Sequence, residues 1–114
     1  MIKQAKNVLA EFQADLLEEN KDCLLFSLPL FEGKFALKKN ENTWIISDEG
    51  YAYLFLASRG FKLYQVEKRL SALISSSKIN DRDGELTVKI NGDFRKSLSL
   101  FVKKLEQIKG ALTA

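Results

Sequence analysis

The residues best able to do chemistry stand together in Ser47-Asp48-Glu49-Gly50, which we call the acidic turn. An apolar run that starts at Trp44 precedes it, and a strongly hydrophobic run that starts at Tyr51 follows it. Adjacent carboxylates at a strand end can hold a divalent cation through their oxygens. A cation held there would activate water, so one hypothesis is a metal-assisted hydrolase at Asp48 and Glu49.

Helix capping explains the acidic turn without catalysis. A short side-chain oxygen accepts hydrogen bonds from the free amides of a first helical turn, which suits Ser47 or Asp48. Asp48 and Glu49 also suit the positive end of the helix dipole. We therefore expect no catalytic residue, bound metal or cofactor, and a cost of about 1 kcal/mol for Asp48→Ala.

Composition excludes several classes of enzyme. The chain has no histidine, which removes Ser-His and Cys-His nucleophile pairs and histidine metal ligands. Cys23 is the only cysteine, so no internal disulfide can form, and at the start of an apolar strand it is expected to be a small buried hydrophobe. No glycine-rich phosphate loop occurs either. The sequence predicts a protein that is not an enzyme.

Length and hydropathy indicate one domain over residues 1–114. Hydrophobic residues make up 46% of the 114 residues and charged residues 29%, an ordinary globular balance. The first residues lead into an amphipathic stretch and not into the apolar centre of a signal peptide. No apolar run approaches the roughly 20 residues that span a bilayer, so a cytoplasmic protein is expected.

Periodicity predicts an α+β fold. Apolar residues at spacings of three and four indicate helices over 2–19, 49–59 and 65–76, and from residue 94 onward. Alternation and turn residues indicate strands over 23–29, 34–38 and 43–47, and a hairpin of 78–80 with 85–90. We expect an antiparallel sheet (a three-strand meander plus the hairpin) packed with about four helices. The helix over 49–59 is apolar nearly all round, so burial on several sides is expected.

The C-terminal helix carries a heptad-like apolar seam. Its members recur at spacings of four and three: Phe94, Leu98, Phe101, Leu105, Ile108 and Leu112. Packing within the domain is favoured, because an exposed seam would leave a large apolar patch. A dimer seam is the alternative, so the protein is expected to be a monomer or a homodimer through this helix.

Positive charge is concentrated in the second half of the chain. Residues 1–60 hold 7 basic and 9 acidic groups, whereas residues 61–114 hold 11 basic and 6 acidic groups. The C-terminal helix contributes Arg95, Lys96, Lys103, Lys104 and Lys109. These residues are candidate contacts to a partner or to nucleic acid. A solvated helix face explains them equally well.

Two segments resemble the domain of unknown function 1828 family, whose members come from bacteria and their phages. The two segments are the proline-containing run from Leu28 to Lys34 and the run from Trp44 to Tyr51, which is followed by Leu54 and Gly60. The resemblance covers about half of the chain. It implies an accessory gene near mobile elements and supplies no catalytic residues.

The preferred function is therefore non-enzymatic binding of a protein partner, as in inhibitors, immunity proteins and antitoxins. A nucleic-acid-binding accessory protein that uses the basic half is the first alternative. The metal-assisted hydrolase is the second.

Overall fold

The structure is a computed structural model that describes the backbone of residues 1–113 and the side chains of residues 1–111. Within these residues it has four helices and a six-stranded antiparallel sheet, which confirms the α+β class. The elements are α1 (Ile2–Glu11), β1 (Asp15–Asn20), β2 (Cys23–Ser27), β3 (Phe35–Asn40), β4 (Thr43–Ser47), α2 (Tyr51–Ser58), α3 (Leu63–Ile74), β5 (Ile79–Arg82), β6 (Glu85–Lys89) and α4 (Phe94–Thr113).

The strand order in the sheet is β1-β2-β3-β4-β6-β5. Strands β1 to β4 form a meander, and the β5–β6 hairpin joins it because β6 pairs with β4. The hairpin turn is Asp83-Gly84, where both residues have positive φ angles of 52° and 94°. Asp-Gly suits such a two-residue turn, since both positions need a left-handed backbone. The predicted hairpin is therefore confirmed.

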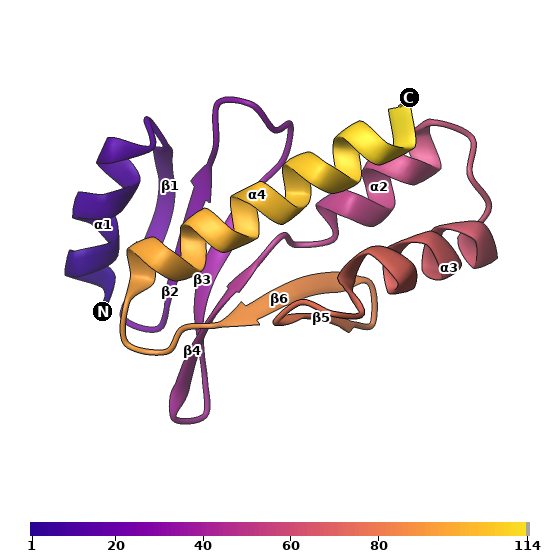
Figure 1. Cartoon of the computed structure of the whole chain (residues 1–114). Coiled ribbons are helices and arrows are strands. Elements are labelled where there is room, and N and C mark those ends of the chain that lie inside the picture. Colours follow the sequence, from indigo (N-terminus) through magenta and orange to yellow (C-terminus); the bar gives the residue numbers. More distant parts are fainter. Residues whose placement is uncertain (114) are drawn as a thin grey trace.

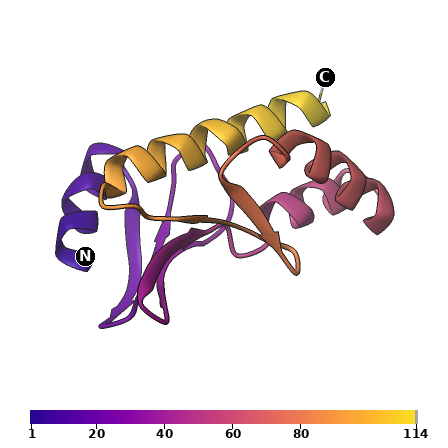
Figure 2. The same ribbon diagram turned by 60° about the horizontal axis from the view of Figure 1, so that its bottom comes forward.

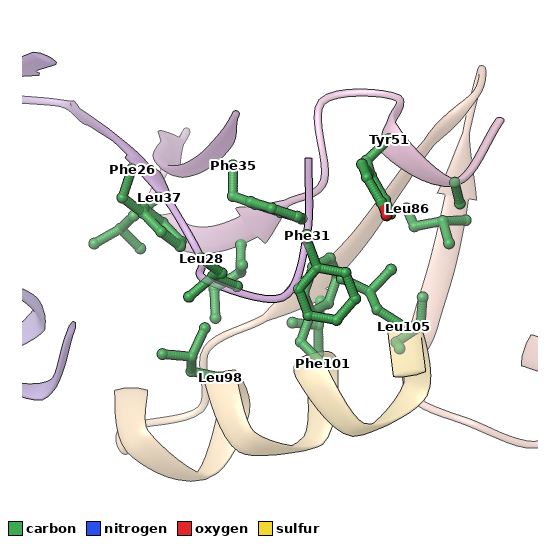
Figure 3. Packing of buried hydrophobic residues seen from close by; sticks show 14 of the residues in the cluster. Phe26, Leu28, Phe31, Phe35, Leu37, Tyr51, Leu86, Leu98, Phe101 and Leu105 are labelled. Carbon is green, nitrogen blue, oxygen red and sulfur yellow. The ribbon is translucent and has the colours of Figure 1, made fainter. Parts of the chain in front are cut away.

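The helices gather on one side of the sheet (Figure 1 and Figure 2). Helix α4 crosses this side and contacts α1, α2 and α3. The strands turn alternate side chains toward α4, and Figure 3 shows Phe26, Leu37 and Leu86 facing Phe101. All four of these side chains are fully buried. Burial of a leucine or phenylalanine contributes about 1.5–3 kcal/mol, so this layer holds the helices on the sheet.

The predicted seam of α4 packs inside the molecule. Phe94, Leu98 and Phe101 are fully buried, and Leu105 and Ile108 are each 2% exposed. The side chain of Leu112, the last predicted member, lies outside the described residues. Packing within the domain is confirmed for the described part of the seam, while the oligomeric state stays a prediction.

The predicted helix over 2–19 is wrong beyond Glu11. The backbone turns at Gln13, whose φ is 58°, and Ala14 N–H donates to the Leu9 carbonyl at 3.0 Å, which closes the helix. The segment 15–20 is strand β1, so the meander has four strands and not three. Leu16 lies four residues after Phe12, as a helix face requires, but pairing with β2 outweighs this local spacing.

Helix α2 is buried on several sides, as expected, since it contacts α3, α4 and β6. Tyr51, Ala52 and Leu56 are buried, but Leu54 is 69% exposed. The helix therefore presents one large apolar side chain to its surroundings.

No helix among the described residues is long and apolar enough to cross a membrane.

Candidate functional site

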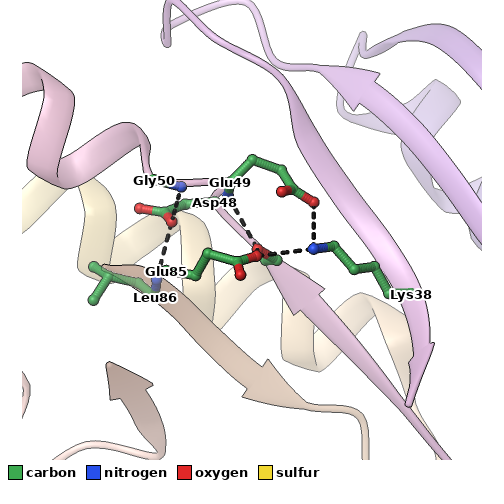
Figure 4. A network of polar contacts seen from close by, with 7 residues as sticks. Lys38, Asp48, Glu49, Gly50, Glu85 and Leu86 are labelled. Atoms are coloured by element: carbon green, nitrogen blue, oxygen red, sulfur yellow. Dashed lines mark hydrogen bonds and ion pairs between the residues drawn. The ribbon is translucent and has the colours of Figure 1, made fainter. Parts of the chain in front are cut away.

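The acidic turn joins β4 to α2, and its Asp48 side chain is fully buried. Asp48 Oδ1 accepts from the backbone N–H of Gly50 at 2.9 Å and of Leu86 at 3.0 Å. Asp48 Oδ2 accepts from the N–H of Ala52 at 2.9 Å. The carboxylate therefore connects the start of α2 to strand β6 (Figure 4).

The cap lies at a different residue from the predicted one. Gly50 occupies the N-cap position with φ at 85°, and Glu49 before it has φ at 51°. Two consecutive left-handed residues turn the chain back so that Asp48 reaches the first-turn amides from two positions upstream. The capping interaction is thus present at Asp48, but the prediction that Ser47 or Asp48 is itself the N-cap residue is wrong.

Burial raises the pKa of Asp48, although the three amide hydrogen bonds work to lower it. Both carboxylate oxygens already accept backbone amides, and the side chain has no exposed surface. Among the described residues, no group of three histidine, cysteine, aspartate or glutamate side chains converges on a metal-sized site. The geometry of Asp48 thus favours a structural role over metal binding.

A second polar network lies on the face of the sheet away from the helices (Figure 4). Lys38 Nζ lies 2.7 Å from Glu49 Oε1 and 2.8 Å from Glu85 Oε1. Ser47 Oγ donates to Glu85 Oε1 at 2.7 Å and accepts from Glu49 N–H at 3.0 Å. One lysine on β3 thus holds carboxylates from the acidic turn and from β6.

The charges of this network stabilise each other. Burial works to lower the pKa of Lys38, but hydrogen bonds to Glu49 and Glu85 outweigh it and raise the pKa. Hydrogen bonds from Lys38 and Ser47 lower the pKa of Glu85. Ser47 is fully buried and its hydroxyl proton is donated to Glu85, so this serine is not placed as a nucleophile.

Sequence reasoning missed Lys38 and Glu85. Strand alternation could have indicated the face of the sheet on which each lies, since Lys38 follows the buried Leu37 and Glu85 precedes the buried Leu86. Alternation places both side chains on the same face as Ser47. Their meeting also requires the β3-β4-β6 order, which joins segments far apart in the chain.

A pocket of about 320 Å³ opens beside α2, and we call it the α2 pocket. Tyr51, Leu54 and Phe55 supply apolar surface, and Arg59 and Lys109 supply cations. The Arg59 guanidinium lies 4.7 Å and Lys109 Nζ 5.8 Å from the centre of the Phe55 ring. The remaining lining residues are Glu32, Gly33, Lys34, Asp48, Glu49 and Ser58. The pocket thus combines aromatic surface with side chains of both charges.

The five basic residues predicted as contacts do not form one stripe. Arg95 makes two hydrogen bonds to Glu11 Oε2 and one to Oε1, at 2.7–3.0 Å. Lys104 Nζ donates to the Leu73 carbonyl at 3.3 Å, and Lys109 Nζ donates to the Leu30 carbonyl at 3.0 Å. These three side chains bind other parts of the same molecule. Lys96 and Lys103 are exposed.

Lys96 belongs instead to a basic hollow of about 140 Å³. Lys78 and Lys89 line the same hollow, and Asp93 is its acidic residue. Lys103 lies seven residues after Lys96 on α4, so both point to the same side of the helix. Positive charge thus gathers beside the N-terminal part of α4.

Cys23 is half-buried at the start of β2, and not fully buried as expected. Burial raises the pKa of its thiol, and the negative charge of Glu49 raises it further. A raised pKa keeps the thiol protonated, which is unfavourable for a nucleophile.

Fold and site together define a small α+β protein in which an acidic strand-to-helix turn connects a helix to an antiparallel sheet by hydrogen bonds. The chain belongs to the family described as Domain of unknown function DUF1828, which matches residues 34–108. The match includes the acidic turn, Lys38 and Glu85, and begins after α1, β1 and β2. The predicted family is confirmed, and the match covers about two thirds of the chain instead of about half. Of the run from Leu28 to Lys34, only Lys34 lies within the match. No curated protein and no solved structure matches the chain.

Proposed function

We propose that this protein is a non-enzymatic binding protein of a bacterium or phage. It acts on a protein partner by surface complementarity, as inhibitors, immunity proteins and antitoxins do. The observation that carries the proposal is a pair of highly exposed leucines, Leu30 and Leu54, beside the α2 pocket. They are 68% and 69% exposed.

The two leucines flank a common group of side chains. Leu54 lines the α2 pocket, whose Lys109 also lines a neighbouring shallow pocket with Leu30 and Phe31. Lys109 Nζ donates to the Leu30 carbonyl at 3.0 Å, which fixes the loop that carries Leu30 beside α4. Large apolar side chains next to a concave surface are typical of sites where a partner's side chains are buried.

The side chains most suited to catalysis are already engaged in contacts within the fold, which favours a binding protein over an enzyme. Asp48 uses both oxygens on backbone amides, and Lys38 holds Glu49 and Glu85. Catalysis by these carboxylates would require breaking contacts that hold α2 and β6 together. The aromatic surface of the α2 pocket favours a partner that presents an apolar side chain.

Copurification from the native host tests this proposal with two matched variants. Leu54→Asp places a charge at the α2 pocket, and Leu63→Asp places the same charge on α3, where Leu63 is 65% exposed. We expect wild-type protein and the Leu63 variant to retain the same protein partner. The Leu54 variant should bind it at least about tenfold more weakly, as loss of a central apolar contact does.

Urea unfolding of each variant separates lost binding from lost folding. Equal retention of the partner by both variants would place the interface elsewhere. Absence of any protein partner, together with turnover of a substrate by the purified protein, would refute the proposal.

Nucleic-acid binding is a second candidate because of the basic hollow. Lys78, Lys89 and Lys96 come from three separate parts of the chain and line one surface depression, which suits phosphate groups. The apparent affinity for duplex DNA should then fall steeply between about 50 and 200 mM salt, since each phosphate contact releases counterions.

Charge reversal tests this candidate quantitatively. Lys89→Glu with Lys96→Glu should reduce the slope of log affinity against log salt by about 2, one unit per lost phosphate contact. The control pair Lys21→Glu with Lys68→Glu changes net charge equally at exposed positions on the β1–β2 turn and α3. Equal slopes for both pairs would refute a specific role for the hollow.

A further inference from the structure

Strand β1 is an edge strand of the sheet, and helix α1 lies beside it. It is the first strand in the order, so it pairs with β2 on one side, and no other strand of the described residues pairs with it on its outer side. All six of its residues are exposed. Figure 1 shows β1 at the end of the sheet that lies farthest from β5. An edge strand carries unpaired N–H and C=O groups, so it can accept a further strand.

The side chains of β1 add apolar surface to this edge. Leu16 is 47% exposed and Leu17 is 43% exposed. The pairing with β2 is irregular between Leu16 and Glu18, which leaves Leu17 without a direct partner in β2. Two leucines beside unpaired backbone can contact alternate side chains of an added strand.

Negative charge on β1 determines which strand fits. Asp15 lies opposite Ser27 and Glu18 opposite Leu25, on the face of the sheet away from the helices. Glu19 already forms an ion pair with Lys6 of α1. No salt bridge joins Asp15 or Glu18 to a cation within residues 1–111. A strand added here meets two carboxylates that have no cationic partner.

A second copy of β1 is a poor occupant of this edge, because pairing of two copies would bring the carboxylates of both strands close together. Like charges that lie opposite each other across strands destabilise the pairing. We infer that β1 accepts an extended, basic segment of a protein partner as a seventh strand of the sheet. This inference rests on the proposed function only in that the partner is a protein, and it uses a surface distinct from the α2 pocket.

A synthetic peptide of about eight residues, alternating lysine and valine and blocked at both ends, is a suitable probe. We expect it to bind the full chain and to slow hydrogen exchange of backbone amides in β1 but not in β5. A peptide with glutamate in place of lysine should not bind. A lysine-valine peptide with a central proline should bind more weakly, because proline removes a ladder hydrogen bond.

Charge-matched variants separate recognition by β1 from general attraction. Asp15→Lys with Glu18→Lys should weaken peptide binding about tenfold, since two favourable cross-strand pairs become repulsive. Glu67→Lys with Glu106→Lys makes the same change in net charge on α3 and α4 and should change the affinity less than about twofold. The Leu54→Asp variant should bind the peptide normally, so failure at β1 and failure at the α2 pocket are distinguishable.

Three results would overturn the inference. The first is peptide binding without protection of β1 amides. The second is equal weakening by the two charge-reversal pairs. The third is self-association of the free protein with protection of β1, which would assign this edge to a second copy.

Discussion

Replacement of Asp48 by alanine should destabilise the protein by about 3 kcal/mol, well above an ordinary capping loss. The variant removes the acceptor of three backbone amides, those of Gly50, Ala52 and Leu86. Ala52 is 1% exposed and Leu86 is fully buried, so water cannot readily replace the carboxylate at these two amides.

The magnitude follows from the two buried donors. A buried donor without an acceptor costs about 1–3 kcal/mol, so two of them cost about 4 kcal/mol. Removal of the buried charge offsets part of this cost, because burial disfavours the ionised form of Asp48. The expected net loss in free energy of unfolding is therefore about 3 kcal/mol, compared with the 1 kcal/mol predicted from the sequence.

Urea unfolding followed by the fluorescence of Trp44, which packs partly buried against the core, measures this loss. Asp93→Ala is the matched control, because exposed Asp93 accepts one first-turn amide, that of Lys96, at 3.3 Å. The control should lose about 0.5–1 kcal/mol. Equal losses for both variants would refute the argument that buried amides depend on Asp48.

Three further predictions concern charge, backbone and metal. Glu85→Gln should cost about 0.5 kcal/mol at pH 7. This difference should disappear as pH falls through the lowered pKa of Glu85, because wild type then loses its ionised carboxylate; a difference that grows in acid would contradict it. Gly33→Ala should cost about 2 kcal/mol in urea unfolding, because φ is 143° and a Cβ would lie 3.0 Å from Tyr51 Cδ1. Gly92→Ala, with φ at 82° and open space around it, should cost less, and equal costs would contradict the contact argument. Titration calorimetry with Mg²⁺, Mn²⁺ or Ca²⁺ should give no binding heat with wild type or Asp48→Asn, whereas heat that only wild type gives would restore the hydrolase hypothesis.

Local sequence patterns predicted the elements that depend on their own periodicity. The α4 seam could be recognised because buried residues from Phe94 to Ile108 recur within a single helix. The β5–β6 hairpin could be recognised because Asp83-Gly84 suits a turn whatever surrounds it. The family could likewise be recognised from two short contiguous runs, Leu28 to Lys34 and Trp44 to Tyr51, followed by Leu54 and Gly60.

Features that depend on distant parts of the chain were harder to predict from the sequence. Leu16 continues the helical spacing of α1, yet it belongs to β1, because pairing with β2 satisfies the backbone of residues 15–20. The partial exposure of α2 also depends on its neighbours. Its sequence is apolar on nearly every side, and α3, α4 and β6 contact it, but none of them covers Leu54, which stays exposed.

The sequence by itself determined that an acidic turn starts a helix, that histidine chemistry is absent, and that α4 has one apolar face. These properties follow from residue types and from spacings of a few residues. Only the tertiary structure decided what the carboxylates contact. Asp48 meets Leu86, and Lys38 meets Glu85, because β4 pairs with both β3 and β6. The acidic turn connects helix and sheet because strand order, which no local pattern encodes, brought the Leu86 amide to Asp48 and Lys38 to Glu49.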